Sequence, residues 1–216
     1  MKRLLKNVLV AGALALGAAC SSFEVKPGFN AVYSGVNTQA EKGYTRVFTG
    51  GSVGNDAVRM HHHSLNEISG TDINTYFGRN SLGVEAANLG IEVIVEAKGG
   101  SSGLFAGQPQ YGIRDNNLPG MLGANRGFVQ GTTNGEDINL TLLYGKSLDG
   151  LSSSSSPLSL ELFNSYDHKK DTKDSNLTEI IVDWSLTNNF SLFARQDTND
   201  LKFNDSSYII GGVLKF

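Results

Sequence analysis

The sequence predicts an all-β fold, a closed antiparallel up-and-down transmembrane β-barrel of about 10–12 strands. Three observations support this prediction: an N-terminal secretion signal, several segments that alternate apolar and polar residues, and a final apolar strand that ends at an aromatic residue. After residue 20 no segment reaches the roughly 20 apolar residues of a spanning helix, so strands must carry the fold. In lipid, strands pair all their backbone groups only by closing into a barrel.

The composition fits one folded domain that does not bind nucleic acid. Hydrophobic residues make up 39% of the 216 residues and charged residues 18%, which is enough apolar sequence for a single domain and argues against disorder. The formal net charge is -3, and the 18 basic residues are scattered along the chain. No basic stripe is therefore available to bind phosphates, and we exclude nucleic acid as a partner.

Residues 1–19 are a predicted signal peptide, and residues 20–216 the predicted barrel domain. A basic start is followed by the apolar residues 8–16 and then by small residues. Cys20 comes next, in the position where a bacterial lipoprotein carries an acylated cysteine, so it is the candidate lipid-attachment residue. The alternative is simple cleavage after Ala19 without lipidation. In either case this single cysteine has no partner for an internal disulfide.

Period-two alternation predicts the strands. Each of the clearest segments places apolar residues on one face and mostly polar residues on the other. These segments are 91–98, 137–144, 158–163 and 179–186. About eleven strands are visible in all, and we expect 10–12 because single-chain bacterial barrels have even counts. The first five are expected near 29–36, 44–53, 57–64, 73–86 and 90–98, with six more to follow.

Turns and loops are expected between these strands. Gly and Asn accept the positive φ of tight turns, which predicts turns at Asn88-Leu89-Gly90, Asn134-Gly135 and Thr187-Asn188-Asn189. Longer polar loops are expected at 147–157, 167–176 and 197–206, and the serine run 152–156 is assigned no chemistry. Residues 99–124 break the alternation. They form either a long loop, which could fold into the interior, or a weak strand near 111–114.

The end of the chain predicts a closing strand that also serves as an assembly signal. Tyr208, Ile210, Leu214 and Phe216 share one face of this strand. This arrangement resembles the C-terminal signal of outer-membrane barrels, which implies recognition by the barrel assembly machinery. The alternative is an ordinary closing strand of a soluble β-protein.

Two stretches resemble the general Gram-negative porin family, the trimeric diffusion porins. Gly78 to Glu96 is similar to an early hairpin of the family, with a Leu-Gly turn and a second strand that ends in glutamate. Residues 182–195 together with 211–216 are similar to its last three strands. The resemblance implies a location in the outer membrane of a Gram-negative bacterium. The chain is too short for a porin of about 16 strands, so it would be a reduced member or a distinct small barrel.

If the apolar faces meet outer-membrane lipid, the polar faces line the interior. Acids outnumber bases there, and rings of acidic side chains favour cations, so we expect a weak cation preference. The alternative is that these charges pair with one another inside a plugged barrel, because a barrel of this size has a narrow interior. The predicted pore-lining residues are Arg79, Glu85, Glu92, Glu96, Asp137, Glu161, Glu179, Asp183, Arg195 and Lys215.

His61-His62-His63 is the most conspicuous local motif. Alternation places His61 and His63 on one face of a strand and His62 on the other. Two imidazoles at this spacing can share a metal ion, but zinc needs further ligands and none has a recognisable spacing, so neither a metal nor a cofactor is predicted. His63 and Ser64 are adjacent and point to opposite faces, so they cannot pair as base and nucleophile, and no enzyme is predicted.

Three functions follow from these patterns. The first is a porin-like barrel that passes small hydrophilic solutes or ions, alone or as a homo-oligomer. The second is a non-conducting structural or adhesive barrel that presents polar loops, and the third is a soluble β-barrel or sandwich that binds a ligand and is tethered by Cys20.

The membrane functions predict that Trp184 faces lipid at the periplasmic boundary, because it shares a face with Val182 and Leu186 just before a tight turn.

Overall fold

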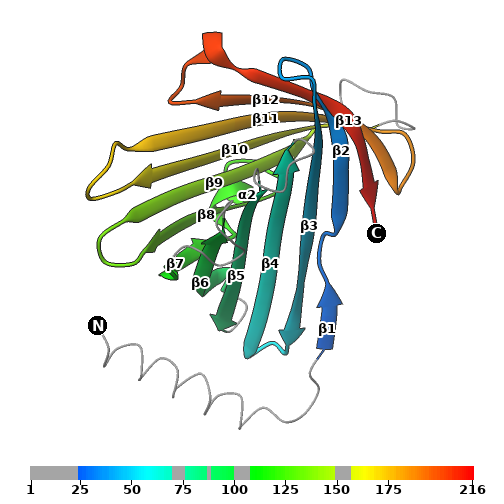
Figure 1. The fold of residues 1–216 in the computed structure, drawn as a ribbon. Coiled ribbons are helices and arrows are strands. Elements are labelled where there is room, and N and C mark those ends of the chain that lie inside the picture. The colour runs from blue at the N-terminus through cyan, green and yellow to red at the C-terminus, as the bar shows by residue number, and fades with distance from the viewer. Residues whose placement is uncertain (1–23, 70–75, 87–88, 100–107, 149–156) are drawn as a thin grey trace.

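The computed structural model describes residues 24–69, 76–86, 89–99, 108–148 and 157–216, and strands make up most of this part of the chain (Figure 1). The strands are β1 (Glu24–Pro27), β2 (Ala31–Asn37), β3 (Lys42–Gly54), β4 (Val58–Ser69), β5 (Tyr76–Ala86), β6 (Ile91–Gly99), β7 (Gln110–Asp115), β8 (Arg126–Thr133), β9 (Ile138–Ser147), β10 (Leu158–His168), β11 (Ser175–Ser185), β12 (Phe190–Asn199) and β13 (Ser207–Lys215). A short helix, α2 (Leu118–Met121), and a 3-10 turn, η2 (Phe203–Asp205), lie in connections. No helix of the described chain is long and apolar enough to cross a membrane.

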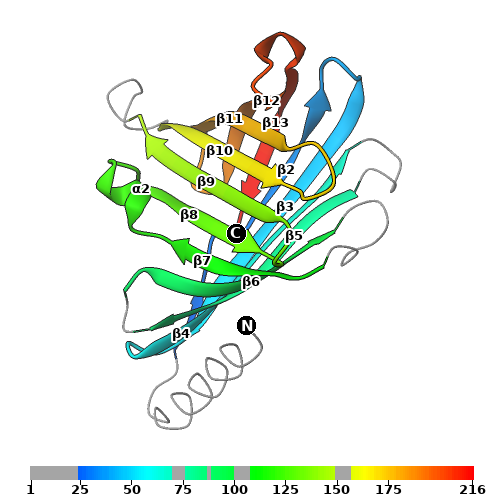
Figure 2. The same ribbon diagram turned by 90° about the vertical axis from the view of Figure 1, so that its left-hand side faces the viewer.

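Strands β2 to β13 form a closed barrel of 12 antiparallel strands. Each strand pairs with the strands before and after it in the sequence, and β13 pairs with β2 to close the wall. In the closing pair, Ile209 lies opposite Asn37 and Lys215 opposite Ala31. Figure 2 shows the wall curling around the interior. The predicted up-and-down barrel is therefore confirmed, at the upper end of the expected strand count.

Eleven strands are visible in the sequence, and β7 is the additional strand that brings the barrel to twelve. It lies inside the segment where alternation breaks down. Ile113 lies opposite Val93 of β6 and opposite Gly131 of β8, so β7 is a full member of the wall. Its six residues include Gly112, and the helix α2 follows it closely, which explains why the pattern is weak. The weak-strand alternative for residues 99–124 is confirmed, although residues 100–107 lie outside the described residues.

Strand β1 was not expected from the sequence. It pairs with Gly51–Gly54 at the end of β3, and β2 pairs with the earlier part of the same strand. Between them the Gly28 N–H donates to Gly50 O at 3.1 Å, and the register shifts by one residue. β1 and β2 therefore run along β3 as one strand that is interrupted by a bulge. Glutamate, lysine and proline make β1 a poor strand by sequence alone.

Several strands are longer than alternation predicted. β4 continues past residue 64 to Ser69, and because β10 extends to His168 and β11 begins at Ser175, the loop expected at 167–176 is shortened to 169–174. Several outward positions in these extensions are polar and form hydrogen bonds: Asn66 Nδ2 donates to Ser64 Oγ at 2.7 Å, and Asn164 Nδ2 to Thr178 Oγ1 at 2.8 Å. Polar residues then occur on both faces, so alternation weakens although backbone pairing continues.

The predicted tight turns all connect neighbouring strands. Gly90 and Gly135 have φ values of 69° and 101°, the left-handed region that favours glycine. At the third turn the Thr187 N–H donates to Phe190 O at 3.0 Å. Asn88, the serine run, the signal peptide 1–19 and Cys20 lie outside the described residues.

The outer wall is largely apolar apart from the polar positions of the strand extensions and His62, whereas the inner wall combines charged residues with an apolar cluster. Outward side chains such as Leu82, Val93 and Leu140 are about half exposed. One side of the interior was expected to be polar but instead packs apolar residues from β2, β3, β11, β12 and β13. This cluster contains Ala31, Tyr33, Tyr44, Ile181, Phe193, Ile209 and Val213.

Candidate functional site: the barrel interior

The predicted pore-lining residues point into the interior, with one exception. Eight of them are buried there: Arg79, Glu85, Glu92, Glu96, Glu161, Glu179, Asp183 and Arg195. Lys215 is half-buried, and its Nζ donates to Ser191 Oγ at 2.7 Å. Asp137 lies in the β8–β9 turn, where its N–H donates to Asn134 Oδ1 at 2.7 Å. It precedes the first paired residue of β9, so turn bonds determine its position.

The predicted pore-lining set lacks several interior charges, among which bases outnumber acids. Arg114 was missed because it lies on the weak strand β7, and Arg46 because its neighbours on the inner face are Tyr44 and Phe48. With these residues included, acids and bases are nearly equal in number. The excess of acids on which the predicted cation preference depended is therefore not a property of the whole interior. The additional residues are Arg46, Arg59, Lys98, Arg114, Arg126, Glu67, Asp167 and Asp197.

Glu179 is the centre of a buried ion cluster that connects four strands. Its two oxygens accept from Arg46 Nη1 and Nη2, each at 2.7 Å, and one oxygen also accepts from Arg195 Nη2 at 2.9 Å. Glu67 Oε2 accepts from Arg46 Nε at 2.8 Å, and Tyr44 Oη bonds to Arg195. The side chains of both arginines and of Glu179 are at most 4% exposed. We call these five residues the Glu179 cluster.

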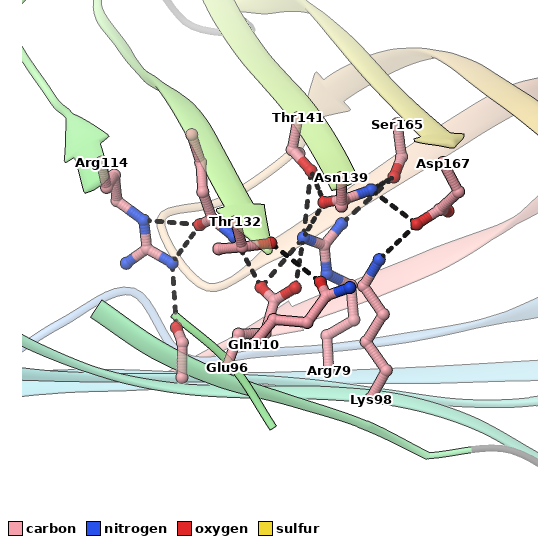
Figure 3. A network of polar contacts seen from close by, with 12 residues as sticks. Arg79, Glu96, Lys98, Gln110, Arg114, Thr132, Asn139, Thr141, Ser165 and Asp167 are labelled. Atoms are coloured by element: carbon pink, nitrogen blue, oxygen red, sulfur yellow. Dashed lines mark hydrogen bonds and ion pairs between the residues drawn. The ribbon is translucent and has the colours of Figure 1, made fainter. Parts of the chain in front are cut away.

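A second network crosses the interior between strands that are not neighbours (Figure 3). Arg79 Nη2, from β5, donates to Glu96 Oε1 at 2.8 Å and to Thr141 Oγ1 of β9 at 3.0 Å. Lys98 Nζ of β6 donates to Asp167 Oδ1 of β10 at 2.7 Å. These side chains narrow the interior. We call the residues labelled in Figure 3 the Arg79 network: Arg79, Glu96, Lys98, Gln110, Arg114, Thr132, Asn139, Thr141, Ser165 and Asp167.

A cavity of about 340 Å³ lies inside the barrel, bordered by both charge networks. Four phenylalanines line it, and each has a guanidinium group over its ring. Arg114 lies 4.7 Å from the ring centre of Phe128, and Arg126 lies 4.9 Å from that of Phe29. The other two pairs are Arg79 with Phe163 and Arg46 with Phe48. Guanidinium groups held in this way can donate to hydroxyl, carboxylate or phosphate oxygens of a small solute.

The histidine motif has the predicted alternation. His61 and His63 border the cavity, and His62 is exposed on the outer wall. Ser64 points outward and its Oγ donates to Asn80 Oδ1 at 2.6 Å, so it cannot meet His63. His168 ends β10, where it is exposed and its Nδ1 lies 2.8 Å from Asp174 Oδ1.

Tyr208, Ile210 and Leu214 of the predicted assembly signal lie on the outer face of β13, and Phe216 directly follows this strand. Tyr208, Ile210, Leu214 and Phe216 are exposed, and the Phe216 N–H donates to Asn30 O at 3.1 Å beside the start of β2. Phe216 thus lies where β13 and β2 close the barrel. Recognition of this face by the barrel assembly machinery remains a prediction.

The apolar outer wall, the paired charges inside it and the arginine-lined cavity are the features from which a function is inferred. The first suits contact with lipid and the other two suit contact with a polar solute. No model of a known protein family matches the sequence, and no similar protein was found among the curated proteins.

Proposed function

We propose that this protein is an outer-membrane β-barrel of a Gram-negative bacterium through which small hydrophilic solutes diffuse passively. The observation that carries the proposal is the inverted wall, which is apolar outside and charged inside. Val93 and Val95 of β6 point outward and are 51% and 43% exposed, while Glu92 and Glu96, which flank them in the sequence, point inward and are at most 2% exposed. A barrel surrounded by water has the opposite arrangement, whereas a barrel in lipid requires this one.

Two further features support the passage of solutes. The hairpin Gly78 to Glu96 and the last three strands, which resemble diffusion porins, are real elements of the wall, β5–β6 and β11–β13. The cavity also offers several guanidinium groups to a solute. Because interior acids and bases are nearly balanced, we propose a pathway with little preference for cations over anions, in place of the cation preference expected from the sequence.

Single-channel recording tests the pore. The full chain refolded into planar bilayers is expected to open discrete channels, and Arg79→Ala is expected to give a larger conductance because it removes a guanidinium group that reaches across the interior. Lys170→Ala is the control, because Lys170 pairs with Glu136 at 3.0 Å in an exposed loop contact. Heat-dependent gel migration verifies that each variant has folded. If folded wild-type protein opens no channels, the Arg79 network plugs the barrel and the protein is a non-conducting outer-membrane barrel.

Trp184 tests the contact with lipid. Its side chain lies on the outer wall, 47% exposed, beside the turn at 187–189 and close to the chain end, where the Lys215 N–H donates to Asn189 O at 2.8 Å. It is the only tryptophan, so its fluorescence reports a single position. Bromine on acyl-chain carbons near the headgroups is expected to quench it more strongly than bromine near the bilayer centre. Fluorescence unaffected by bromine at every depth would show that this face does not contact lipid.

A further inference from the structure

We propose that His61, His63 and Glu92 form a binding site for a divalent transition-metal ion on the inner wall of the barrel. Each residue offers one ligand atom, and these atoms all lie within 4.8 Å of one another. Glu92 is the further ligand that the sequence alone did not reveal. It lies on β6, two strands away from the histidines on β4. The expectation that the motif binds no metal is therefore replaced.

The two histidines are already arranged as a pair. They lie on the same inward face of β4, and their rings are parallel, with 6.2 Å between ring centres and 1° between planes. A tetrahedral zinc ion with ligands at about 2.0–2.1 Å separates its ligand atoms by roughly 3.4 Å. Small side-chain rotations therefore suffice to bring the three ligand atoms around one ion.

Gly83 provides the space through which Glu92 reaches the histidines. Gly83 is the cross-strand partner of His61 on β5, and its position faces the interior. A Cβ added at Gly83 would overlap Glu92 Oε2 and would lie 3.2 Å from Ile94 Cγ2. The glutamate carboxylate thus occupies the place of the missing side chain, directly beside His61. Without this glycine the third ligand could not approach.

The hydrogen bonds of the two imidazoles also favour a metal. His63 Nε2 is buried and has no hydrogen-bond partner within the described residues, which is costly for a polar atom unless it binds something else. His61 Nε2 lies 3.0 Å from Glu85 Oε2. A carboxylate on one ring nitrogen leaves the other free to bind a metal, and this arrangement is usual around protein-bound zinc.

The surroundings of Glu92 suit a divalent cation. Asn116 Nδ2 donates to Glu92 Oε1 at 2.6 Å and orients the carboxylate, while Arg114 Nη1 lies 3.4 Å from Oε2. Glu85 and Glu92 carry one negative charge each, and Arg114 carries one positive charge. The net charge around the site is therefore negative before an ion binds. Two imidazoles and one carboxylate are a donor set for zinc, nickel or copper, with further coordination positions left for water or a solute oxygen from the cavity.

Zinc titration of the full chain, purified in detergent without a histidine tag and stripped with a chelator, tests this site. We expect one tightly bound zinc ion per chain, measured by competition with a chromogenic chelator. His63→Ala is expected to weaken binding at least tenfold, because it removes a ligand. His62→Ala is the matched control: it removes the same chemical group from the same strand, but from the outer wall.

A second variant keeps the test decisive if His63→Ala does not fold. Glu92→Gln preserves the shape of the side chain while removing its charge, and it should weaken zinc binding by a similar factor. The proposal is wrong if wild-type protein binds no zinc, if His62→Ala weakens binding as much as His63→Ala, or if folded Glu92→Gln binds zinc as tightly as wild type. None of these results depends on whether the barrel conducts.

Discussion

Replacing Glu179 by glutamine is expected to lower the free energy of unfolding of the refolded barrel by about 3–5 kcal/mol. The substitution preserves the volume of the side chain, so the effect comes from charge and not from a cavity. Arg46 and Arg195 would remain buried and lose a carboxylate that both of them contact. Glu67, 3.3 Å from Arg195 Nη1, and Asp197, 2.6 Å from Arg195 Nη2, would remain, but neither replaces the two hydrogen bonds that Arg46 donates to Glu179.

Equilibrium unfolding in denaturant, with the barrel refolded in lipid vesicles, measures this loss. Glu136→Gln is the matched control: it makes the same chemical change in the exposed Lys170–Glu136 ion pair and should cost less than about 1 kcal/mol. The comparison also reports on the interior. A loss for Glu179→Gln as small as that of the control would show that water reaches the Glu179 cluster and solvates the arginines, as in an open lumen.

Replacing Val93 by arginine is expected to have the second largest effect, a loss of about 2–4 kcal/mol if this position lies near the centre of the bilayer. Val93 lies on the outer face of β6 between Ile91 and Val95, and all three side chains are exposed. An arginine there must take its charge into hydrocarbon. On a barrel surrounded by water the same change would alter stability by no more than about 0.5 kcal/mol.

The matched control for this variant is Gln39→Arg, which places the same side chain in the exposed β2–β3 turn. Both variants are compared with wild type by unfolding in vesicles of the same lipid. Equal stabilities of the two variants would contradict the lipid-facing wall. The third function derived from the sequence, a soluble barrel tethered by Cys20, would then explain the protein better.

The sequence by itself determined most of the strands and the orientation of most of their side chains. Glu92, Glu96, Glu179 and Asp183 point inward as alternation predicts, because successive side chains on a strand point to opposite faces whatever the rest of the chain does. The turns at Gly90 and Gly135 were predictable for the same reason, since a positive φ is a local requirement. Local geometry needs only neighbouring residues, and these are visible in the sequence.

Only the tertiary structure decided which strands meet and which charges pair. The sequence did not reveal that β7 completes the wall, that Arg46 reaches Glu179 from β3 to β11, or that Glu92 joins His61 and His63. These contacts depend on the closure of the barrel and on strand register, which bring together residues far apart in the chain. A residue's face follows from its own strand, but its partner follows from the curvature of the whole wall.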